Sequence, residues 1–344
     1  MKPVISVIIA AYNAEKTLKA CLDSVFDQDF DSYEVILVND GSTDDTAKML
    51  DEYAARGRDF KVLHQGNKGP SHARNRGMAL ANGRFLLFLD ADDMLAPGAL
   101  DSLGGLVEDG QYDFIEFDYI QFKDGTPFDK VLSRDPERGF FRGISEGSGQ
   151  DLFVDWIDKA FFWTSANSRI YSTDFLRRHG LLFPEGVFFE DTIWTPRVFK
   201  LAQKAKYEPV LVYLRRLDRQ GSTMYKYRTE LDPQQLKDRL FIAKALYELS
   251  CDGGNTSAFS HTLQRMACSV FFKACTRIWI ESDASFWNSM SADFSQEWHL
   301  LRFSPSWKIK IFYFVTPLIG MRNMREAFLV GRLLKNFLHG GKGT

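Results

Sequence analysis

Short apolar runs alternate with amphipathic segments along the N-terminal part of the chain. Four runs rich in Val, Ile, Leu and Phe have the length of buried strands, at 4–10, 33–40, 60–65 and 84–90. The segments between them carry apolar residues at helical spacing, at 14–26, 44–57 and 71–83. Alternation of this kind predicts the α/β class, with a mostly parallel sheet covered by helices on both faces.

Polar clusters fall where these strands are expected to end. The clusters are Tyr12–Asn13, Asn39–Asp45 and Asp90–Asp93. Ligands of open α/β sheets bind beyond the carboxyl ends of the strands. The sequence therefore predicts a ligand site at this edge of the sheet.

The remainder of the chain is less regular. A fifth strand is expected at 112–122, and a stretch rich in Gly, Asp and Arg at 123–149 is expected to form a loop over the site. Mixed structure returns at 150–217, and from Asp232 onward the pattern is helical.

Composition places the chain among ordinary globular proteins. Its 344 residues, 45% of them hydrophobic, can bury a full core. The formal net charge is -2, but residues 302–344 hold eight Lys or Arg and one Glu. The chain therefore combines an acidic body with a basic C-terminal tail.

The cysteines and the apolar runs bear on the compartment. Cys21, Cys251, Cys268 and Cys275 show neither CxxC spacing nor the density of a disulfide scaffold, so we expect core thiols. The N-terminal apolar run is too short for a secretory signal, and no window reaches the ~18 apolar residues of a spanning helix. These features predict a cytoplasmic protein that is soluble or peripheral on the inner face of the cell membrane.

Asp90, Asp92 and Asp93 admit two interpretations. Asp92 or Asp93 could cap the helix that begins near Pro97. Asp90 directly follows a buried run, where a charge needs a partner. Closely spaced carboxylates suit a hard divalent cation such as Mg²⁺ or Mn²⁺, so the cluster predicts a cation site.

Two further segments carry charged residues next to strand ends. Residues 38–46 fit a turn followed by a capped helix, or a site in which Asp40 accepts hydrogen bonds from a nucleobase. Arg74 and Arg76 lie near a helix N-terminus, where the helix dipole disfavours cations. They indicate either an anionic ligand or pairing with the nearby aspartates.

Five segments together resemble the family 2 inverting glycosyltransferases in order and spacing. They are SVIIAAYNAEKTL, YEVILVNDGSTDDT, GPSHARNRG, GRFLLFLDADD and FFEDTIWTPR, within about residues 4–225. The resemblance implies a GT-A nucleotide-sugar-binding sandwich at 1–225, with a donor half at about 1–122 and an acceptor half at about 150–225. Residues 226–344 would form a helical C-terminal region.

The resemblance also implies roles for residues at the donor end. Tyr12 and Asp40 would contact the nucleotide base, and Arg74 would approach the base or the phosphates. Asp90 would reach the ribose or a metal-bound water. The chain departs from the family's SVIIPxYN pattern by carrying Ala10, which loses a fixed φ in the loop before Tyr12.

The metal and the base complete the implied site. Asp92, with Asp93 adjacent, would hold Mn²⁺ or Mg²⁺ at the diphosphate. Asp191 matches the family's base, which takes the acceptor's proton. Read from the residues alone, Asp191 could instead be a helix N-cap, and Glu190 is its competitor and a candidate on the acceptor side.

Other residues are candidates for substrate contacts. Trp194, one helical turn after the base, and Trp163 could stack on an acceptor sugar, although burial is the more common state of such aromatics. Arg215 and Ser222 lie in a stretch that resembles the family's basic segment after the base, from which both could reach the donor diphosphate.

The basic tail suggests an amphipathic helix. Residues 322–338 place apolar side chains on one side of a helix and Arg and Lys on another. This pattern predicts either binding to a membrane surface or packing on the catalytic domain with a solvated basic face. No motif for nucleic-acid binding accompanies the charge.

The residues and the resemblance together predict a metal-assisted inverting glycosyltransferase of the bacterial surface-polysaccharide type. It would move a hexose from a nucleotide-diphosphate donor, a UDP-sugar, to a hydroxyl of a surface glycan or lipid-linked oligosaccharide. Two alternatives stay open: a catalytically silent sugar- or lipid-binding module of the same fold, and a phosphatase with a DxD motif. The intact acidic residues argue against the first, and the position of the motif after the fourth strand argues against the second.

Overall fold

The computed structural model describes residues 2–56, 59–136, 143–160, 162–217, 232–281, 294–306, 309–311 and 313–314. The chain separates into two compact units, Met1–Lys226 and Tyr227–Thr344. Ser222 and the amphipathic pattern at 322–338 lie outside the described residues. Within those residues, no helix has both the length and the apolar character needed to cross a membrane.

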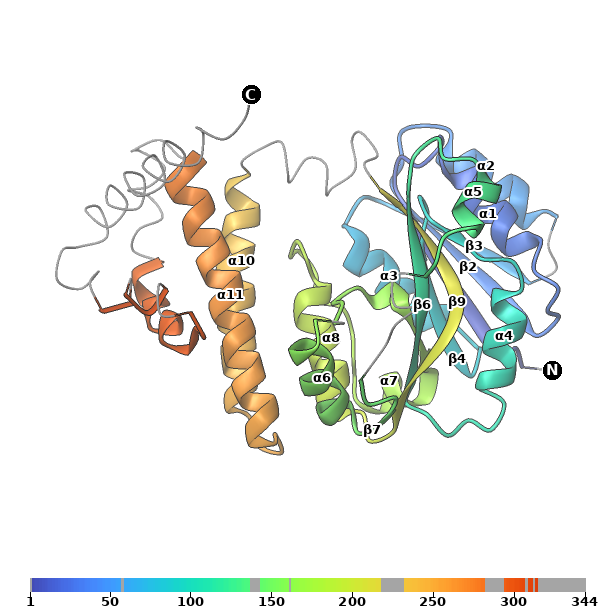
Figure 1. Cartoon of the computed structure of the whole chain (residues 1–344). Helices are drawn as coiled ribbons and strands as arrows, with labels where there is room; N and C mark the ends of the chain where they lie inside the picture. The colour runs from blue at the N-terminus through green and yellow to red at the C-terminus, as the bar shows by residue number, and fades with distance from the viewer. Residues whose placement is uncertain are drawn as a thin grey trace, which may run out of the picture. The chain divides into compact units, whose positions relative to one another are not determined.

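In the described part of the N-terminal unit, nine strands form one sheet (Figure 1). They are β1 (Ile5–Ala11), β2 (Tyr33–Asp40), β3 (Phe60–Gln65), β4 (Phe85–Asp90), β5 (Met94–Leu95), β6 (Phe114–Lys123), β7 (Glu146–Gly147), β8 (Arg169–Ser172) and β9 (Ala205–Leu217). The strand order is β3-β2-β1-β4-β8-β6-β9-β5, with β7 on β9.

Three strands of the sheet, β5, β7 and β8, run antiparallel to the strands that they pair with. β3, β2, β1 and β4 pair in parallel, and β8 is antiparallel to both β4 and β6. β6 and β9 are again parallel to each other. The predicted α/β class with a mostly parallel sheet is therefore confirmed, and the carboxyl ends of β1, β2 and β4 meet at one edge.

Helices cover both faces of this sheet. They are α1 (Leu18–Phe26), α2 (Thr46–Ala54), α3 (Pro70–Leu80), α4 (Ala99–Leu106), α5 (Phe128–Leu132), α6 (Gly149–Asp158), α7 (Thr173–Arg178) and α8 (Asp191–Leu201), with the 3-10 turn η1 (Ala166–Ser168). Alternate residues of β1 face opposite layers, as the strand period requires. Val7 and Ile9 join the core cluster that includes α1, α2 and α4, whereas Ile8 faces α3.

The contact between α3 and β1 depends on a glycine. A Cβ added at Gly77 would lie 2.4 Å from Cγ2 of Ile8, well inside van der Waals contact. Arg74 precedes Gly77 by one helical turn, and both are buried on the side of α3 that faces the sheet. Glycine thus lets the helix that carries Arg74 lie directly on the strand.

The stretch at 123–149 is more ordered than expected. It contains α5 and β7, and residues 137–142 lie outside the described part. Val131 of α5 is fully buried in a small cluster with Met94, Ile120 and Phe122. The expectation of a loop without secondary structure was wrong here, because this helix has its own hydrophobic anchor.

The described part of the C-terminal unit is helical, as the pattern from Asp232 onward predicts. It consists of α10 (Pro233–Cys251), α11 (Ser257–Glu281) and the 3-10 helix η2 (Trp298–Phe303). Helices α10 and α11 lie side by side, and the turn between them includes Asn255, whose Nδ2 donates to the carbonyl of Leu249 at 2.8 Å (Figure 1).

Candidate active site

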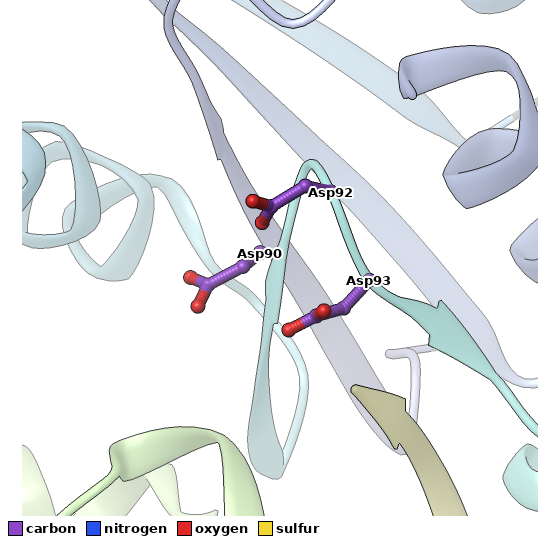
Figure 2. Close-up of side chains that lie close together, drawn as sticks. All are labelled: Asp90, Asp92 and Asp93. Carbon is purple, nitrogen blue, oxygen red and sulfur yellow. The ribbon is translucent and has the colours of Figure 1, made fainter. Parts of the chain in front are cut away.

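The three aspartates of the predicted cluster lie on the turn that follows β4. Asp90, Asp92 and Asp93 each offer a carboxylate oxygen, and these oxygens lie within 4.8 Å of one another. The backbone N–H of Asp93 donates to the carbonyl of Asp90 at 3.0 Å, which closes the turn. Figure 2 shows all three side chains on the same side of the turn. Like charges this close need compensation from donors or cations.

Two N–H donors orient the carboxylate of Asp90. Arg74 Nη2 donates to Oδ1 at 2.9 Å, and Asn167 Nδ2 donates to Oδ2 at 2.6 Å. A carboxylate oxygen has two lone pairs, so Asp90 can still accept a hydrogen bond from a ligand.

Asp93 is bound to strand β9. Its Oδ2 accepts from the hydroxyl of Tyr213 at 2.7 Å, and its Oδ1 accepts from the backbone N–H of Arg216 at 2.7 Å. Its side chain is buried. Burial and the neighbouring carboxylates raise the pKa of Asp93 well above its usual range.

Asp92 differs from Asp93 because its side chain is only partly buried. Arg216 Nε donates to the carbonyl oxygen of Asp92 at 2.9 Å, which fixes the backbone here and leaves the carboxylate out of this contact. A set of three carboxylates at one turn provides the oxygen ligands that hard divalent cations take, so these residues fit Mn²⁺ or Mg²⁺.

Arg74 links the acidic turn to the start of α8. Its Nη1 donates to Oε1 of Glu190, and its guanidinium lies 5.4 Å from the ring centroid of Phe183. Burial alone would lower the pKa of Arg74, but Asp90 and Glu190 raise it well above its ordinary value. The predicted pairing with carboxylates is thus present, and a contact of Arg74 with an anionic ligand stays a prediction.

Asp191 lies at the first residue of α8, beside Glu190. The residue before this pair, Phe189, has φ +66°, a strained conformation for a residue with a Cβ. Burial and the carboxylate of Glu190 raise the pKa of Asp191 from 3.8 to about 7, against the opposing effect of Arg74. Its Oδ1 is buried and accepts no hydrogen bond from any described residue. A carboxyl in this state can exchange a proton near neutral pH.

The residues predicted to contact the base lie at the ends of β1 and β2. The side chain of Tyr12 is exposed. The carboxylate of Asp40 accepts from Gln65 Nε2 at 2.8 Å and from the backbone N–H groups of Lys68 and Gly69 at 2.9 and 2.8 Å. Asp40 therefore organises the loop before α3.

Trp163 and Arg215 lie together beside the acidic turn. They line a small pocket with Tyr119, Ser165, Asn167, Ser168 and Tyr213. The guanidinium of Arg215 lies 5.0 Å from the ring centroid of Trp163. Trp163 is partly exposed, so it keeps the surface that a stacking role requires.

Trp194 occupies a different environment from Trp163. It is fully buried, stacks on Phe183 at a centroid distance of 4.2 Å and donates through Nε1 to the carbonyl of Leu181. It has no exposed face for a sugar, so the expectation of an acceptor contact was wrong. Its spacing from Asp191 reflects the core side of α8.

Two residues of the site were not anticipated from the sequence, Asn167 and Tyr213. Asn167 Nδ2 donates to the hydroxyl of Tyr213 at 2.9 Å as well as to Asp90. Tyr213 in turn contacts Asp93. Asn167 lies in a polar run before β8 and Tyr213 in the apolar strand β9, and nothing local indicated their partners.

The N-terminal part of the chain is similar to a known protein family. Residues 6–170 match the model of glycosyl transferase family 2. This segment of the chain is similar to that family. Glycosyltransferase EpsH of Bacillus subtilis (strain 168) is 29% identical over 258 residues, which are 72% of this chain and 67% of EpsH.

Solved structures of glycosyltransferases share the architecture. TarS residues 1–349 from S. aureus, in complex with UDP-GlcNAc, superpose with a TM-score of 0.72 at 21% identity, covering 96% of this chain and 92% of TarS. The mannosyltransferase PcManGT from Pyrobaculum calidifontis, in complex with GDP-Man and Mn2+, gives a TM-score of 0.52 at 16% identity, covering 92% and 88%. The protein is a glycosyltransferase with a GT-A fold, and the phosphatase alternative is set aside.

Proposed function

We propose that this family 2 glycosyltransferase moves a sugar, with inversion, from a UDP-sugar to a hydroxyl of a bacterial surface glycan or lipid-linked oligosaccharide. The observation that carries the proposal is the presence of an acidic turn after β4 together with Asp191, whose carboxyl has a raised pKa and a buried oxygen, Oδ1, without a described hydrogen-bond partner. The UDP-GlcNAc complex of TarS supports the choice of nucleotide. The bacterial relative EpsH supports a bacterial glycan as acceptor.

The donor would occupy the edge where β1, β2 and β4 end. The side chain of Tyr12 is exposed at the end of β1, so a base could lie against its ring. Asp90, held by Arg74 and Asn167, would accept a hydrogen bond from the ribose. Arg215 and Ser222 remain proposals for the diphosphate, and Trp163 for the acceptor sugar.

Asp92 is our choice for the principal ligand of the divalent cation, with Asp93 behind it. Both oxygens of Asp93 already accept hydrogen bonds from β9, whereas the side chain of Asp92 is partly exposed. Mn²⁺ or Mg²⁺ bound here would supply positive charge against the departing diphosphate. The Mn2+ complex of PcManGT supports the metal.

Asp191 would take the proton from the acceptor hydroxyl. The hydroxyl oxygen then forms its bond to the anomeric carbon on the face opposite the nucleotide, and the nucleoside diphosphate leaves with the electron pair of the broken bond. Glu190 is the weaker candidate for this role, because its carboxylate binds Arg74. A pKa of about 7 suits a base that works near neutral pH.

A nucleotide panel tests the donor. UDP-, GDP-, ADP- and dTDP-sugars are added with and without Mn²⁺ while the melting temperature is followed, because a ligand that binds only the folded state raises it. We expect the largest rise with a UDP-sugar and Mn²⁺, and slow hydrolysis of that donor. A larger rise with another nucleotide would overturn the choice of UDP, and the absence of any response would overturn the proposal.

A further inference from the structure

The side-chain amide of Asn167 bridges two groups that position the acidic turn. Its Nδ2 lies 2.6 Å from Oδ2 of Asp90 and 2.9 Å from the hydroxyl of Tyr213. Through Tyr213 the bridge continues to Oδ2 of Asp93 at 2.7 Å. One amide therefore connects the first and the last aspartate of the turn, from a separate segment of the chain.

The number of protons in this bridge matches the number of contacts. The amide nitrogen has two hydrogens, one for Asp90 and one for Tyr213. The Tyr213 hydroxyl gives its single hydrogen to Asp93 and accepts from Asn167 and from the backbone N–H of Asp90 at 3.2 Å. Each hydroxyl lone pair and each hydrogen is used, so both side chains have a defined orientation.

The other end of the amide shows what fixes that orientation. Oδ1 of Asn167 is buried and accepts no hydrogen bond from the described residues. A buried acceptor without a donor is unfavourable, and turning the amide over would place this oxygen against the carboxylate of Asp90. The nitrogen side thus decides the arrangement, because it serves Asp90 and Tyr213 together.

The backbone that carries Asn167 is itself held firmly. The hydroxyl of Tyr171 donates to the carbonyl of Ala166 at 2.9 Å. Arg169 Nη1 donates to the carbonyl of Ser165 at 2.9 Å, and its Nε lies 2.6 Å from a carboxylate oxygen of Glu116 in a fully buried ion pair. Residues on both sides of Asn167 are therefore tied to the protein interior.

We propose that Asn167 is a positioning residue of the donor site, which holds Asp90 and, through Tyr213, Asp93 in the arrangement that binds a nucleoside diphosphate with its divalent cation. This inference rests on the proposed function. Asn167 acts through the aspartates and has no direct part in proton transfer. Its loss should weaken donor binding more than it slows the chemical step.

The test compares Asn167→Asp and Asn167→Ala with wild type. Asp has nearly the same size but lacks the NH₂ group and adds a carboxylate next to Asp90, whereas Ala removes the amide altogether. UDP binding with saturating Mn²⁺ and Mn²⁺ binding alone are measured by calorimetry. By analogy with residues that orient metal ligands, we expect UDP affinity to fall roughly 10- to 100-fold, more for Asp than for Ala.

Kinetics separate positioning from damage to the fold. For a positioning residue, KM for the UDP-sugar should rise by about the same factor while kcat stays within about threefold. A fraction of unfolded enzyme would instead lower kcat and leave KM unchanged. Asn255→Asp is the matched control. Asn255 also has a buried Oδ1 without a described partner, and its Nδ2 donates to a backbone carbonyl of the C-terminal unit instead of to the acidic turn.

Tyr213→Phe tests the same hydrogen-bonded bridge at its other residue. It removes the hydroxyl from the same bridge, so its effect on UDP affinity should not add to that of Asn167→Ala in the double variant. Full additivity, or wild-type affinity in both Asn167 variants, would overturn the positioning role. If wild type binds no nucleoside diphosphate of the panel, the proposed donor function fails and this inference fails with it.

Discussion

Two pairs of adjacent carboxylates shape the site, and their partners differ. In the pair at the end of β4, Asp93 accepts from Tyr213 and from a backbone N–H, while Asp92 is partly exposed. In the pair at the start of α8, Glu190 binds Arg74, while Asp191 has an oxygen without a described partner. Asp93 and Glu190 are thus the members whose carboxylates are bound by described donors.

The difference between the pairs lies in charge. The α8 pair has a guanidinium in contact, so one of its two negative charges is balanced within the protein. The described partners of Asp93 are a neutral hydroxyl and a neutral N–H. The comparison teaches that the two pairs suit different roles: the first fits the proposed cation site, and the second contains the carboxyl that we propose as the base.

The largest expected effect separates the members of the α8 pair. Asp191→Asn should lower kcat by roughly 10²- to 10⁴-fold, the usual contribution of a general base. UDP binding with Mn²⁺ should stay near wild type, because Asp191 is proposed to contact the acceptor hydroxyl and not the donor. Product formation and calorimetry on the same preparation measure both. Normal turnover in this variant would show that Asp191 is not the base.

The next effect separates Asp92 from Asp93. Asp92→Asn should weaken Mn²⁺-dependent UDP binding by at least about tenfold, because a cation ligand loses its charge. Asp93→Asn should affect UDP binding less and lower the melting temperature, since an amide can accept only one of the two hydrogen bonds that Asp93 accepts. The reverse ranking in calorimetry and melting would exchange the two roles.

The pH profile of the wild-type enzyme tests the raised pKa of Asp191. The base must be ionised, so kcat/KM should fall about tenfold for each pH unit below the pKa of about 7 that Asp191 has without substrate. Stability depends on pH in the opposite direction. The folded state holds the proton of Asp191 more tightly than the unfolded state, so the free energy of unfolding falls as the pH rises from 3.8 to about 7. Asp191→Asn should therefore gain melting temperature relative to wild type at pH 8 compared with pH 5. A gap independent of pH would contradict this.

The smallest effect concerns the neighbour of the base. Glu190→Gln removes a negative charge that raises the pKa of Asp191 and leaves the positive charge of Arg74 in place. The acid limb of the kcat/KM profile should shift to lower pH, because both conditions favour the ionised form of Asp191. A shift to higher pH would mean that Arg74, rather than Glu190, loses its influence in the variant.

The sequence predicted those features that depend on short segments. The strand ends, the acidic turn and the helix start at Asp191 follow from local apolar patterns and from the family resemblance, and the α/β class with its edge of strand ends is confirmed. The roles of the individual site residues stay predictions.

The parts that escaped prediction depend on contacts across the chain. Asn167 lies 77 residues from Asp90, and Tyr213 lies 120 from Asp93, so no local pattern links them. Helical spacing placed Trp194 near the base but could not tell its core side from its site side. The carboxylate partners of Arg74, 16 and 116 residues away in the chain, could likewise be identified only from the tertiary structure.

The geometry of the candidate active site depends on Gly77, a residue that has no side chain. The short distance between α3 and β1 sets the position of Arg74. A single methyl group at position 77 would lie 2.4 Å from Ile8 and would not fit. Relief of that clash would move the helix outward and draw the guanidinium away from Asp90 and Glu190 together. A substitution at position 77 is thus expected to act through an arginine one turn earlier, so that a defect in the site can originate at a residue without a side chain.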